Sequence, residues 1–206
     1  MSPRRRDTEG TAAARAERRA ELLATAAEVF ASQGYAATTV RQIADAAGIL
    51  GGSLYYHFDS KESMVDEILS TFLNEMWAAY DRVLAAGLGA RETLEAIVVE
   101  SFRSIDRHRA AVVIYQNESR YLAAASERFG YLLDSHRRFK EMWMSLLERG
   151  VREGAFRGDL DLPLVYRFIR DTVWLAAGWY RRDGRLAADD IAKQYLAMVL
   201  EGIQAD

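Results

Sequence analysis

The 206-residue sequence contains no cysteine and only two prolines, Pro3 and Pro163. The absence of cysteine excludes disulfides, thiolate metal sites and a cysteine nucleophile, and it agrees with a reducing cytoplasm. No uncharged apolar run approaches the roughly 18 residues that span a bilayer, and the N-terminus lacks the hydrophobic core of a signal peptide. We therefore expect a cytoplasmic protein with no membrane partner.

Strand signals are also missing, because no run alternates apolar and polar residues over the length of a strand. Half of the residues are apolar, and the chain is long enough to bury a substantial core in one domain or two small ones. We predict an all-α protein of about nine helices. Their expected ranges are 22–33, 40–47, 53–57, 60–85, 90–106, 110–122, 127–153, 162–181 and 187–202.

Charge is unevenly distributed, although the formal net charge is only -3. Residues 1–20 carry three acidic residues and six arginines: Arg4, Arg5, Arg6, Arg15, Arg18 and Arg19. A basic segment of this kind fits an arm that reaches DNA, and it fits equally well a disordered tail followed by a solvated helix. Both interpretations remain open from the sequence.

Two short helices are predicted around a turn between residues 38 and 58. Thr39 followed by Gln42 forms a capping-box pattern at the start of the first, and Gly48 ends it. Gly51 and Gly52 loosen the turn, and residues 52–57 form the second helix. A first helix that ends at Gly34 braces both, and Asp59 or Ser60 can cap a long fourth helix. This is the helix-turn-helix arrangement, in which the second short helix enters the major groove of DNA.

The side chains around the second short helix are suited to phosphate binding. Tyr55, Tyr56 and His57 offer hydroxyl or ring N–H donors, and Lys61 adds a cation at the start of the fourth helix. Each of them, taken alone, is more often a packing or hydrogen-bonding residue of the protein. Leu54 and Phe58 are better assigned to the core.

The stretch "TTVRQIADAAGILGGSLYYHFDSKESMV", residues 38–65, resembles the DNA-binding module of TetR-type repressors. The resemblance implies a DNA-binding domain over residues 1–62, a ligand-binding and dimerisation domain over 63–206, and a homodimer on double-stranded operator DNA. It implies phosphate contacts by Thr39, Tyr55, Tyr56, His57 and Lys61, with Arg41 and Ser53 nearest the base edges. Gly52 is a small residue at which the backbone can approach DNA. The Gly51–Gly52 pair supplies no side chain that could contact the bases. We therefore expect Arg41 or the N-terminal arginines to contribute more to recognition of the base sequence.

Three later stretches, residues 110–123, 140–161 and 164–181, are similar to TetR-type repressors of steroid catabolism. This resemblance implies control of steroid-degradation genes. It also implies, as inducer, an acyl-CoA thioester of the two-ring remnant of a steroid. The alternative is a TetR-type repressor of efflux or fatty-acid genes with another lipophilic ligand.

A ligand pocket is expected beside residues 164–181, where Tyr166, Arg170 and Trp174 share one helix face. A buried arginine needs an anionic or carbonyl partner, either a carboxylate of the chain such as Asp171 or the ligand itself. Other candidate wall residues are Phe102, Tyr115, Trp143 and Met144. Candidates for CoA phosphates, or for ordinary solvated helix faces, are Arg103, Arg107, Arg109 and Arg120.

No catalytic residues, metal ligands or cofactor motif are apparent in the sequence. His108 and His136 have no paired carboxylate, nucleophile or metal-ligand spacing around them, so we expect neither an enzyme nor a cofactor. A purely structural helical dimer would not need the Tyr55–His57 run. We expect the dimer to form through the last two helices, by Trp174, Trp179, Ile191, Tyr195, Met198 and Val199.

Overall fold

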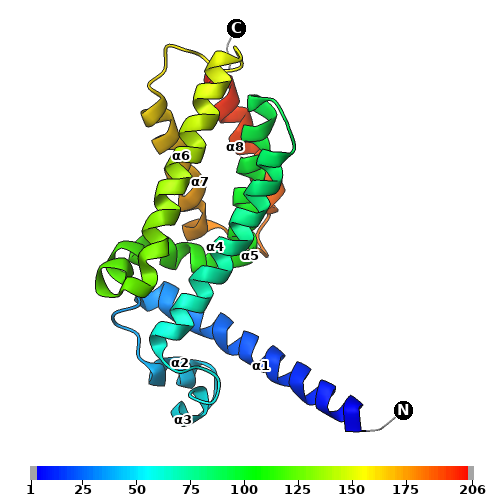
Figure 1. Ribbon diagram of the computed structural model, residues 1–206, viewed down its shortest axis with the longest axis vertical. Coiled ribbons are helices and arrows are strands. Elements are labelled where there is room, and N and C mark those ends of the chain that lie inside the picture. Colours follow the sequence, from blue (N-terminus) through cyan, green and yellow to red (C-terminus); the bar gives the residue numbers. More distant parts are fainter. Residues whose placement is uncertain (1–3, 204–206) are drawn as a thin grey trace. The chain divides into compact units, whose positions relative to one another are not determined.

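The computed structural model describes residues 4–203, with side chains from residue 13 onward, and its regular elements are all helices (Figure 1). The all-α prediction is confirmed. The chain divides into two compact units, Met1–Leu69 and Ser70–Asp206. Helix α4 (Lys61–Ala85) begins in the first unit and continues into the second, so the predicted boundary at residues 62 and 63 lies at the start of this helix.

The first unit consists of α1 (Arg4–Gln33), α2 (Val40–Ala46), α3 (Gly51–Leu54) and the start of α4. Helix α1 ends where Gly34 adopts a φ of 82°, a conformation that glycine takes without strain. Helix α2 begins with the predicted capping box: the Thr39 hydroxyl accepts from the Gln42 N–H at 3.2 Å, and Gln42 Oε1 accepts from the Thr39 N–H at 2.7 Å. Leu54 and Phe58 are buried, as expected.

Helix α3 is shorter than predicted. It ends at Leu54, and the next three residues form a turn in which the His57 N–H donates to the Leu54 carbonyl at 2.9 Å. Ser60, rather than Asp59, caps α4, because Ser60 and Ser63 exchange reciprocal side chain–backbone hydrogen bonds of 3.0 and 3.1 Å. The turn therefore leaves Tyr55 and Tyr56 exposed on the surface of the first unit.

The second unit is a bundle in which α5 (Ala90–Ala125) contacts α6 (Gly130–Arg152), α7 (Leu162–Trp179) and α8 (Ala188–Ile203). A short 3₁₀ turn, Glu127–Phe129, precedes α6. Helix α5 bends at His108, whose φ of -130° and ψ of 34° are not helical. The bend lies between the two separate helices predicted over residues 90–106 and 110–122, so α5 corresponds to both of them.

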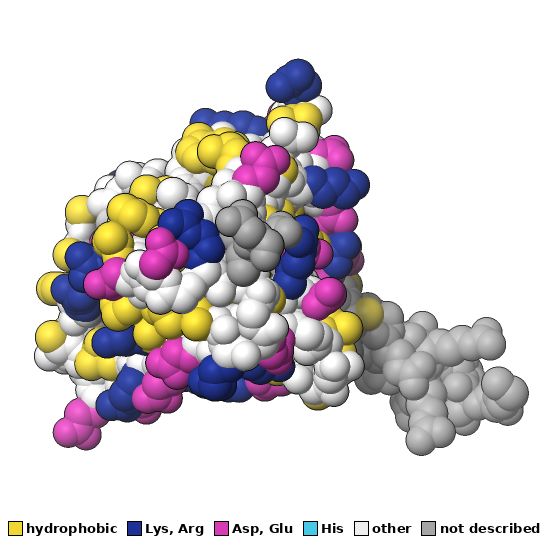
Figure 2. Space-filling model, turned by 90° about the horizontal axis from the view of Figure 1, so that it is seen from above, with side chains coloured by type: hydrophobic (Ala, Val, Ile, Leu, Met, Phe, Trp, Pro, Cys, Tyr) yellow, Lys and Arg dark blue, Asp and Glu magenta, His cyan; other side chains and the backbone are white. Residues whose placement is uncertain are grey.

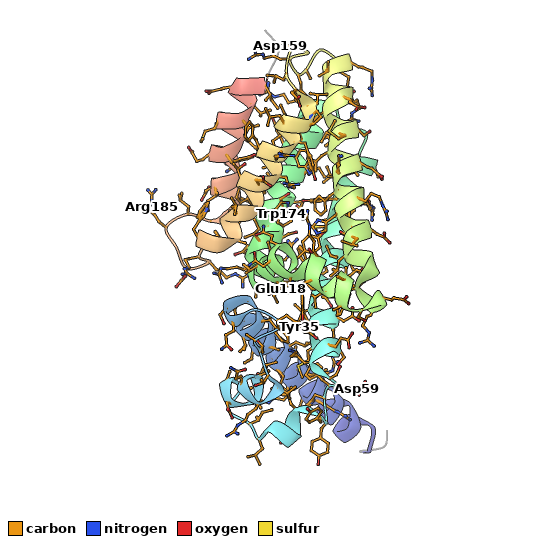
Figure 3. The ribbon with its side chains drawn as sticks, turned by 90° about the vertical axis from the view of Figure 1, so that its left-hand side faces the viewer. Tyr35, Asp59, Glu118, Asp159, Trp174 and Arg185 are labelled. Atoms are coloured by element: carbon orange, nitrogen blue, oxygen red, sulfur yellow. The ribbon has the colours of Figure 1, made fainter. Side chains whose placement is uncertain are left out.

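Aromatic side chains from α4 and α6 build the centre of the second unit. The rings of Trp77 and Phe139 lie 4.8 Å apart, and the Trp77 indole N–H donates to the Ser135 hydroxyl at 3.0 Å. Figure 3 shows Trp174 of α7 pointing into the interior of this bundle, whereas Arg185 lies on the outer loop between α7 and α8. A polar group in such a core is stable when it is hydrogen-bonded, as the indole is here.

The face of the protein seen in Figure 2 carries Lys and Arg side chains next to Asp and Glu side chains. Elsewhere in the described chain, an example of such an ion pair is that of Arg157 with Asp159, with 2.7 Å between nitrogen and oxygen. Within residues 4–203, no helix combines the length and the apolar composition that a membrane span requires. The described residues also contain no cluster of His, Cys, Asp and Glu that could hold a metal ion.

Candidate functional site

The surface around α3 contains most of the residues expected to contact DNA. Tyr55 is 58% exposed and Tyr56 is 80% exposed, and Arg41 projects from α2 with 89% of its side chain accessible. Gly52 is exposed, and Ser53 and His57 are half-buried. The carboxylate nearest to Arg41, that of Asp45, lies 3.9 Å away at an exposed position. Such a pair is weak in water, so the guanidinium can turn to another acceptor.

Two predicted phosphate ligands already have partners within the first unit. The Lys61 ammonium donates to the backbone carbonyls of Tyr35 and Thr38, both at 2.8 Å, and lies 4.2 Å from the Tyr35 ring centre. Partial burial lowers its pKa. The Thr39 hydroxyl donates to Gln42 Oε1 at 2.9 Å. Both residues therefore shape the ends of the loop before α2, and their phosphate contacts stay a prediction.

Two of the N-terminal arginines, Arg18 and Arg19, also have partners within the first unit. Arg18 pairs with Glu21 at 2.7 Å, and Arg19 donates to Glu67 at 2.6 Å while covering the Phe58 ring at 4.5 Å. Arg19 thus joins α1 to α4 inside the unit. The side chains of the predicted arm from Arg4 to Arg6 lie outside the described residues.

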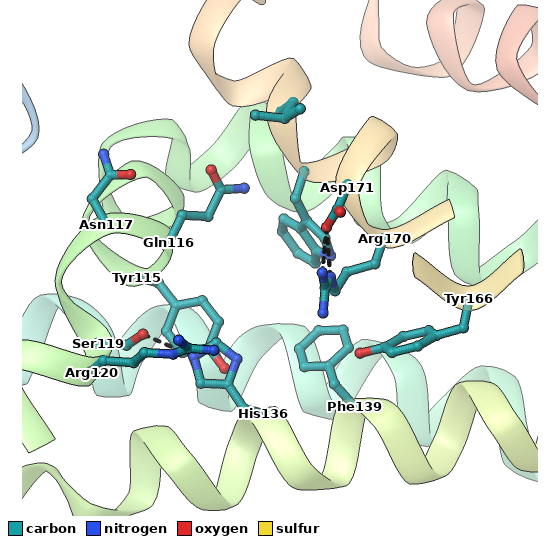
Figure 4. A pocket seen from close by; sticks show the side chains of 12 residues that line it. Tyr115, Gln116, Asn117, Ser119, Arg120, His136, Phe139, Tyr166, Arg170 and Asp171 are labelled. Atoms are coloured by element: carbon teal, nitrogen blue, oxygen red, sulfur yellow. Dashed lines mark hydrogen bonds and ion pairs between the residues drawn. The ribbon is translucent and has the colours of Figure 1, made fainter. Parts of the chain in front are cut away.

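The second unit contains a cavity of about 580 Å³ between α5, α6 and α7 (Figure 4). Residues from α5 and α6 line one side: Tyr115, Gln116, Asn117, Ser119, Arg120, His136 and Phe139. Residues from α7 line the other: Tyr166, Arg170, Asp171, Trp174 and Leu175. Several of these residues are exposed, so the cavity reaches solvent, and its volume is typical of a small-molecule site.

Arg170 is the half-buried cation of the α7 wall. Its guanidinium bonds to Asp171 at 2.6 and 2.7 Å and lies 5.5 Å from the Tyr166 ring centre. Burial lowers the pKa of Arg170, but hydrogen bonds and charge interactions with Asp171 and Tyr166 together outweigh burial, so the pKa is raised overall. The structural partner that the sequence left open is therefore Asp171. Because this carboxylate is itself 47% exposed, the arginine can exchange it for a ligand at moderate cost.

His136 and Tyr115 form the floor of the opposite side. Their rings stack 4.5 Å apart with an interplanar angle of 19°, and His136 Nε2 lies 2.8 Å from the Ser119 hydroxyl. Burial lowers the pKa of His136, and the positive charges of Arg120 and Arg170 lower it further. The cavity lining carries two arginines, Arg120 and Arg170, against the one carboxylate of Asp171, so a ligand with negative charge is favoured in it.

Three predicted wall residues lie elsewhere. Phe102 is buried against Tyr195 of α8, with 5.9 Å between ring centres, and neither Trp143 nor Met144 of α6 lines the cavity. The rotation of α6 turns His136 and Phe139 toward the cavity instead. The predicted pocket residues Tyr115, Tyr166, Arg170 and Trp174 line this cavity, but the prediction missed the polar residues Gln116, Asn117 and Ser119 on α5.

The four arginines proposed to bind CoA phosphates lie in different environments. Arg103 is bound to Asp189 through two hydrogen bonds of 2.8 Å, and Arg107 approaches Glu100 at 3.8 Å. Of the four arginines, Arg120 is the one that lines the cavity. Among the described residues, no ion pair holds Arg120. It therefore remains available to an anionic ligand at the cavity mouth.

Comparison with known proteins agrees with both units. Residues 22–68 match the family described as bacterial regulatory proteins, tetR family, and residues 87–203 match the tetracyclin repressor-like C-terminal domain. The HTH-type transcriptional repressor KstR2 of Rhodococcus jostii (strain RHA1) is 55% identical over 186 residues, covering 90% of this chain and 91% of the relative. KstR2 of Mycobacterium tuberculosis (strain ATCC 25618 / H37Rv) is 50% identical, with 90% and 92% covered.

A solved structure of the ketosteroid transcriptional regulator KstR2 of Mycobacterium tuberculosis superimposes with a TM-score of 0.86 at 50% identity, covering 92% of this chain and 96% of the other. The family matches and these relatives are transcription regulators rather than enzymes. The chain belongs to the TetR family of bacterial transcriptional repressors and is closely related to KstR2.

Proposed function

We propose that the protein is a homodimeric repressor that binds a palindromic operator in the cytoplasm and is released by an acyl-CoA thioester of a two-ring steroid intermediate. The observation that carries the ligand assignment is the cavity in which aromatic rings surround the half-buried Arg170 guanidinium. The relative described as a ketosteroid transcriptional regulator supports the steroid part. AibR, which shares the fold at 21% identity, was solved with isovaleryl coenzyme A and operator DNA, which supports the thioester part.

The dimensions and the lining fit such a ligand. A volume of about 580 Å³ accommodates a two-ring acyl group, while the larger CoA moiety would extend through the open side past Arg120. Trp174 provides an apolar surface for the rings, and Arg170 a planar pair of donors for a carbonyl or carboxylate. Arg120 offers a positive charge to the phosphates on that open side.

Dimerisation is supported by an apolar stripe on α7. Leu164, Phe168, Leu175 and Trp179 recur at helical spacing and are 46 to 63% exposed in the single chain, and Met198 of α8 is 77% exposed. Trp174 faces the cavity, whose edge Leu175 also borders, and Tyr195 is partly buried beside Thr172, with 3.0 Å between the two hydroxyl oxygens. A large exposed apolar face of this kind is typical of a symmetric interface.

Helix α4 connects the cavity to the DNA-binding unit along the chain. Within the second unit, the Phe72 ring of α4 meets Trp174 edge-to-face at 6.2 Å and Tyr115 at 6.0 Å. Glu75, one turn further along α4, lies 2.8 Å from Nε2 of His108 at the bend of α5. A ligand that displaces Trp174 therefore pushes on α4, which begins at Lys61. Changing the separation of two recognition helices lowers operator affinity, since half-sites lie about 34 Å apart.

The decisive experiment is the release of the protein from operator DNA, measured by fluorescence anisotropy. A CoA thioester of a two-ring steroid acid should release it, and free CoA or the free acid should require roughly tenfold higher concentration or more, because each lacks one set of contacts. Equal release by free CoA would contradict the steroid assignment. Release by a fatty acyl-CoA alone, or a different lipophile found by mass spectrometry of the purified protein, would favour the efflux or fatty-acid alternative.

Ligand binding should become tighter as the pH falls from 7.5 to 6.0. The free protein holds the pKa of His136 below 6.5, through burial and through Arg120 and Arg170. A bound anion offsets those two charges, so the pKa of His136 rises and a proton is taken up with the ligand. Burial raises the pKa of Tyr115 and of Tyr166, the two phenols that line the same cavity, so neither changes charge in that range.

The pH effect is measured by ligand titration of wild type and His136→Gln over the same pH range. Comparison with the variant removes the contribution of the ligand's own phosphate groups, which titrate identically in both. If the two proteins show the same pH dependence, His136 does not take up the proton.

A further inference from the structure

Leu50, at the turn before α3, has a surface position that nothing within the described chain explains. Its side chain is 81% exposed, the highest value among the large hydrophobic residues described. Leu50 also occupies the N-cap position of α3, where it makes no side-chain hydrogen bond. Serine, threonine, aspartate or asparagine would accept a hydrogen bond from the first turn, and leucine cannot. Leucine at this position therefore forgoes a cap and leaves its apolar side chain in water.

The two residues that follow Leu50 are glycines, although neither the backbone conformation nor the space around them requires glycine. Neither Gly51 nor Gly52 has a positive φ, and a Cβ added at either would meet no atom within 4 Å beyond its chain neighbours and the backbone of its own helix. Glycine within a helix is less favourable than alanine because it loses more backbone freedom. The protein thus keeps an open surface beside Leu50 at the expense of helix stability.

Leu50 and Gly51 lie at a shallow depression of about 390 Å³. Its lining residues are Val40, Arg41, Asp45, Ile49, Leu50, Gly51 and Tyr55. The exposed Arg41 guanidinium lies on the α2 side, so a cation and an apolar side chain flank the same recess. An edge of a DNA base pair in the major groove offers matching chemistry, since it presents hydrogen-bond acceptors and, at thymine, a methyl group.

We propose that Leu50 is a base-reading residue that contacts the C5-methyl group of one thymine per half-site in the major groove. The proposal rests on the operator binding proposed above and adds a specificity residue to it. Gly51 and Gly52 let the backbone approach the base edges closely, and Leu50 then reaches the groove from the start of α3. The thymine methyl is the one apolar group that unmodified bases expose there, so leucine selects it by excluding water from both surfaces.

Removing the methyl group from DNA isolates this contact. A duplex is first selected by the wild-type protein from a random pool, and each thymine is then replaced in turn by deoxyuridine, which lacks only the methyl. Wild-type affinity should fall about fourfold when either member of one pair of symmetry-related thymines is replaced, the value expected for one buried methyl group. Leu50→Ala should bind the thymine and deoxyuridine duplexes equally at that position.

Two further variants complete the test. Leu133→Ala, which truncates an exposed leucine of α6, should retain the wild-type sensitivity to deoxyuridine. Leu50→Ser introduces a capping residue, so its melting temperature should equal or exceed that of the wild type while its thymine discrimination is lost. A melting temperature well below that of the wild type would show that Leu50 stabilises the protein and would overturn the inference.

The outcomes separate this inference from the proposed function. If wild-type protein binds the selected duplex but no thymine is sensitive, or if Leu50→Ala keeps the full sensitivity, Leu50 does not read thymine although the protein binds DNA. If wild-type protein selects no duplex over random DNA, operator binding itself fails and the inference fails with it.

Discussion

Arg170→Met and Trp174→Leu variants are expected to bind operator DNA with wild-type affinity and to resist release by the CoA thioester. Methionine retains the apolar stem of Arg170 but removes the donors, and loss of a charge-assisted bond corresponds to roughly 10- to 100-fold more ligand for half-release. Leucine at position 174 removes the ring surface and its edge-to-face contact with Phe72, so the ligand also loses its path to α4. Anisotropy with labelled operator measures both effects.

Folding should survive both substitutions. Asp171 is 47% exposed, so its carboxylate remains hydrated when Arg170 is replaced. Arg152→Met on α6, which removes an exposed arginine away from the cavity, is the matched control and should release normally. If Arg170→Met and Trp174→Leu both release at the wild-type ligand concentration, the ligand binds elsewhere and the proposed role of this cavity is wrong.

A Phe168→Glu variant is expected to be monomeric and to lose operator affinity by roughly 100-fold or more. Phe168 lies in the middle of the exposed α7 stripe and is 61% exposed, so glutamate there should leave the fold of a single chain intact. In a symmetric dimer, the substitution places a charge from each chain in one apolar interface. A monomer then binds one half-site without the gain that two linked half-sites provide.

Sedimentation velocity and operator anisotropy test this expectation, with circular dichroism to verify folding. Leu133→Glu on α6 introduces the same charge at another exposed apolar position, 47% exposed, and should remain dimeric. A Phe168→Glu protein that still sediments as a dimer would show that the interface lies on another face. A monomeric wild-type protein would contradict the homodimer altogether.

Local sequence signals predicted most helix boundaries because the interactions that set them lie within a few residues. Thr39 and Gln42 form a reciprocal cap three residues apart, and Gly34 and Gly48 adopt the positive φ that ends a helical turn. The bend of α5 at His108 lies between the two helices expected over residues 90–106 and 110–122. The start of α1 was predicted at residue 22, but the helix begins at Arg4, because the segment before residue 22 has no apolar periodicity to indicate a helix. The limits of α3 were also wrong, because the Tyr55–His57 turn depends on backbone hydrogen bonds that a four-residue helix hardly signals.

The sequence by itself determined the helical class, the helix-turn-helix unit and the α7 face that carries Tyr166, Arg170 and Trp174. Only the tertiary structure decided that His136 and Phe139, rather than Trp143 and Met144, turn toward the cavity, and that Leu50 stays uncovered. The physical reason is that helical periodicity specifies which residues share a face. Which face meets which neighbour depends on the rotation and packing of whole helices, which are set by contacts between residues far apart in the chain.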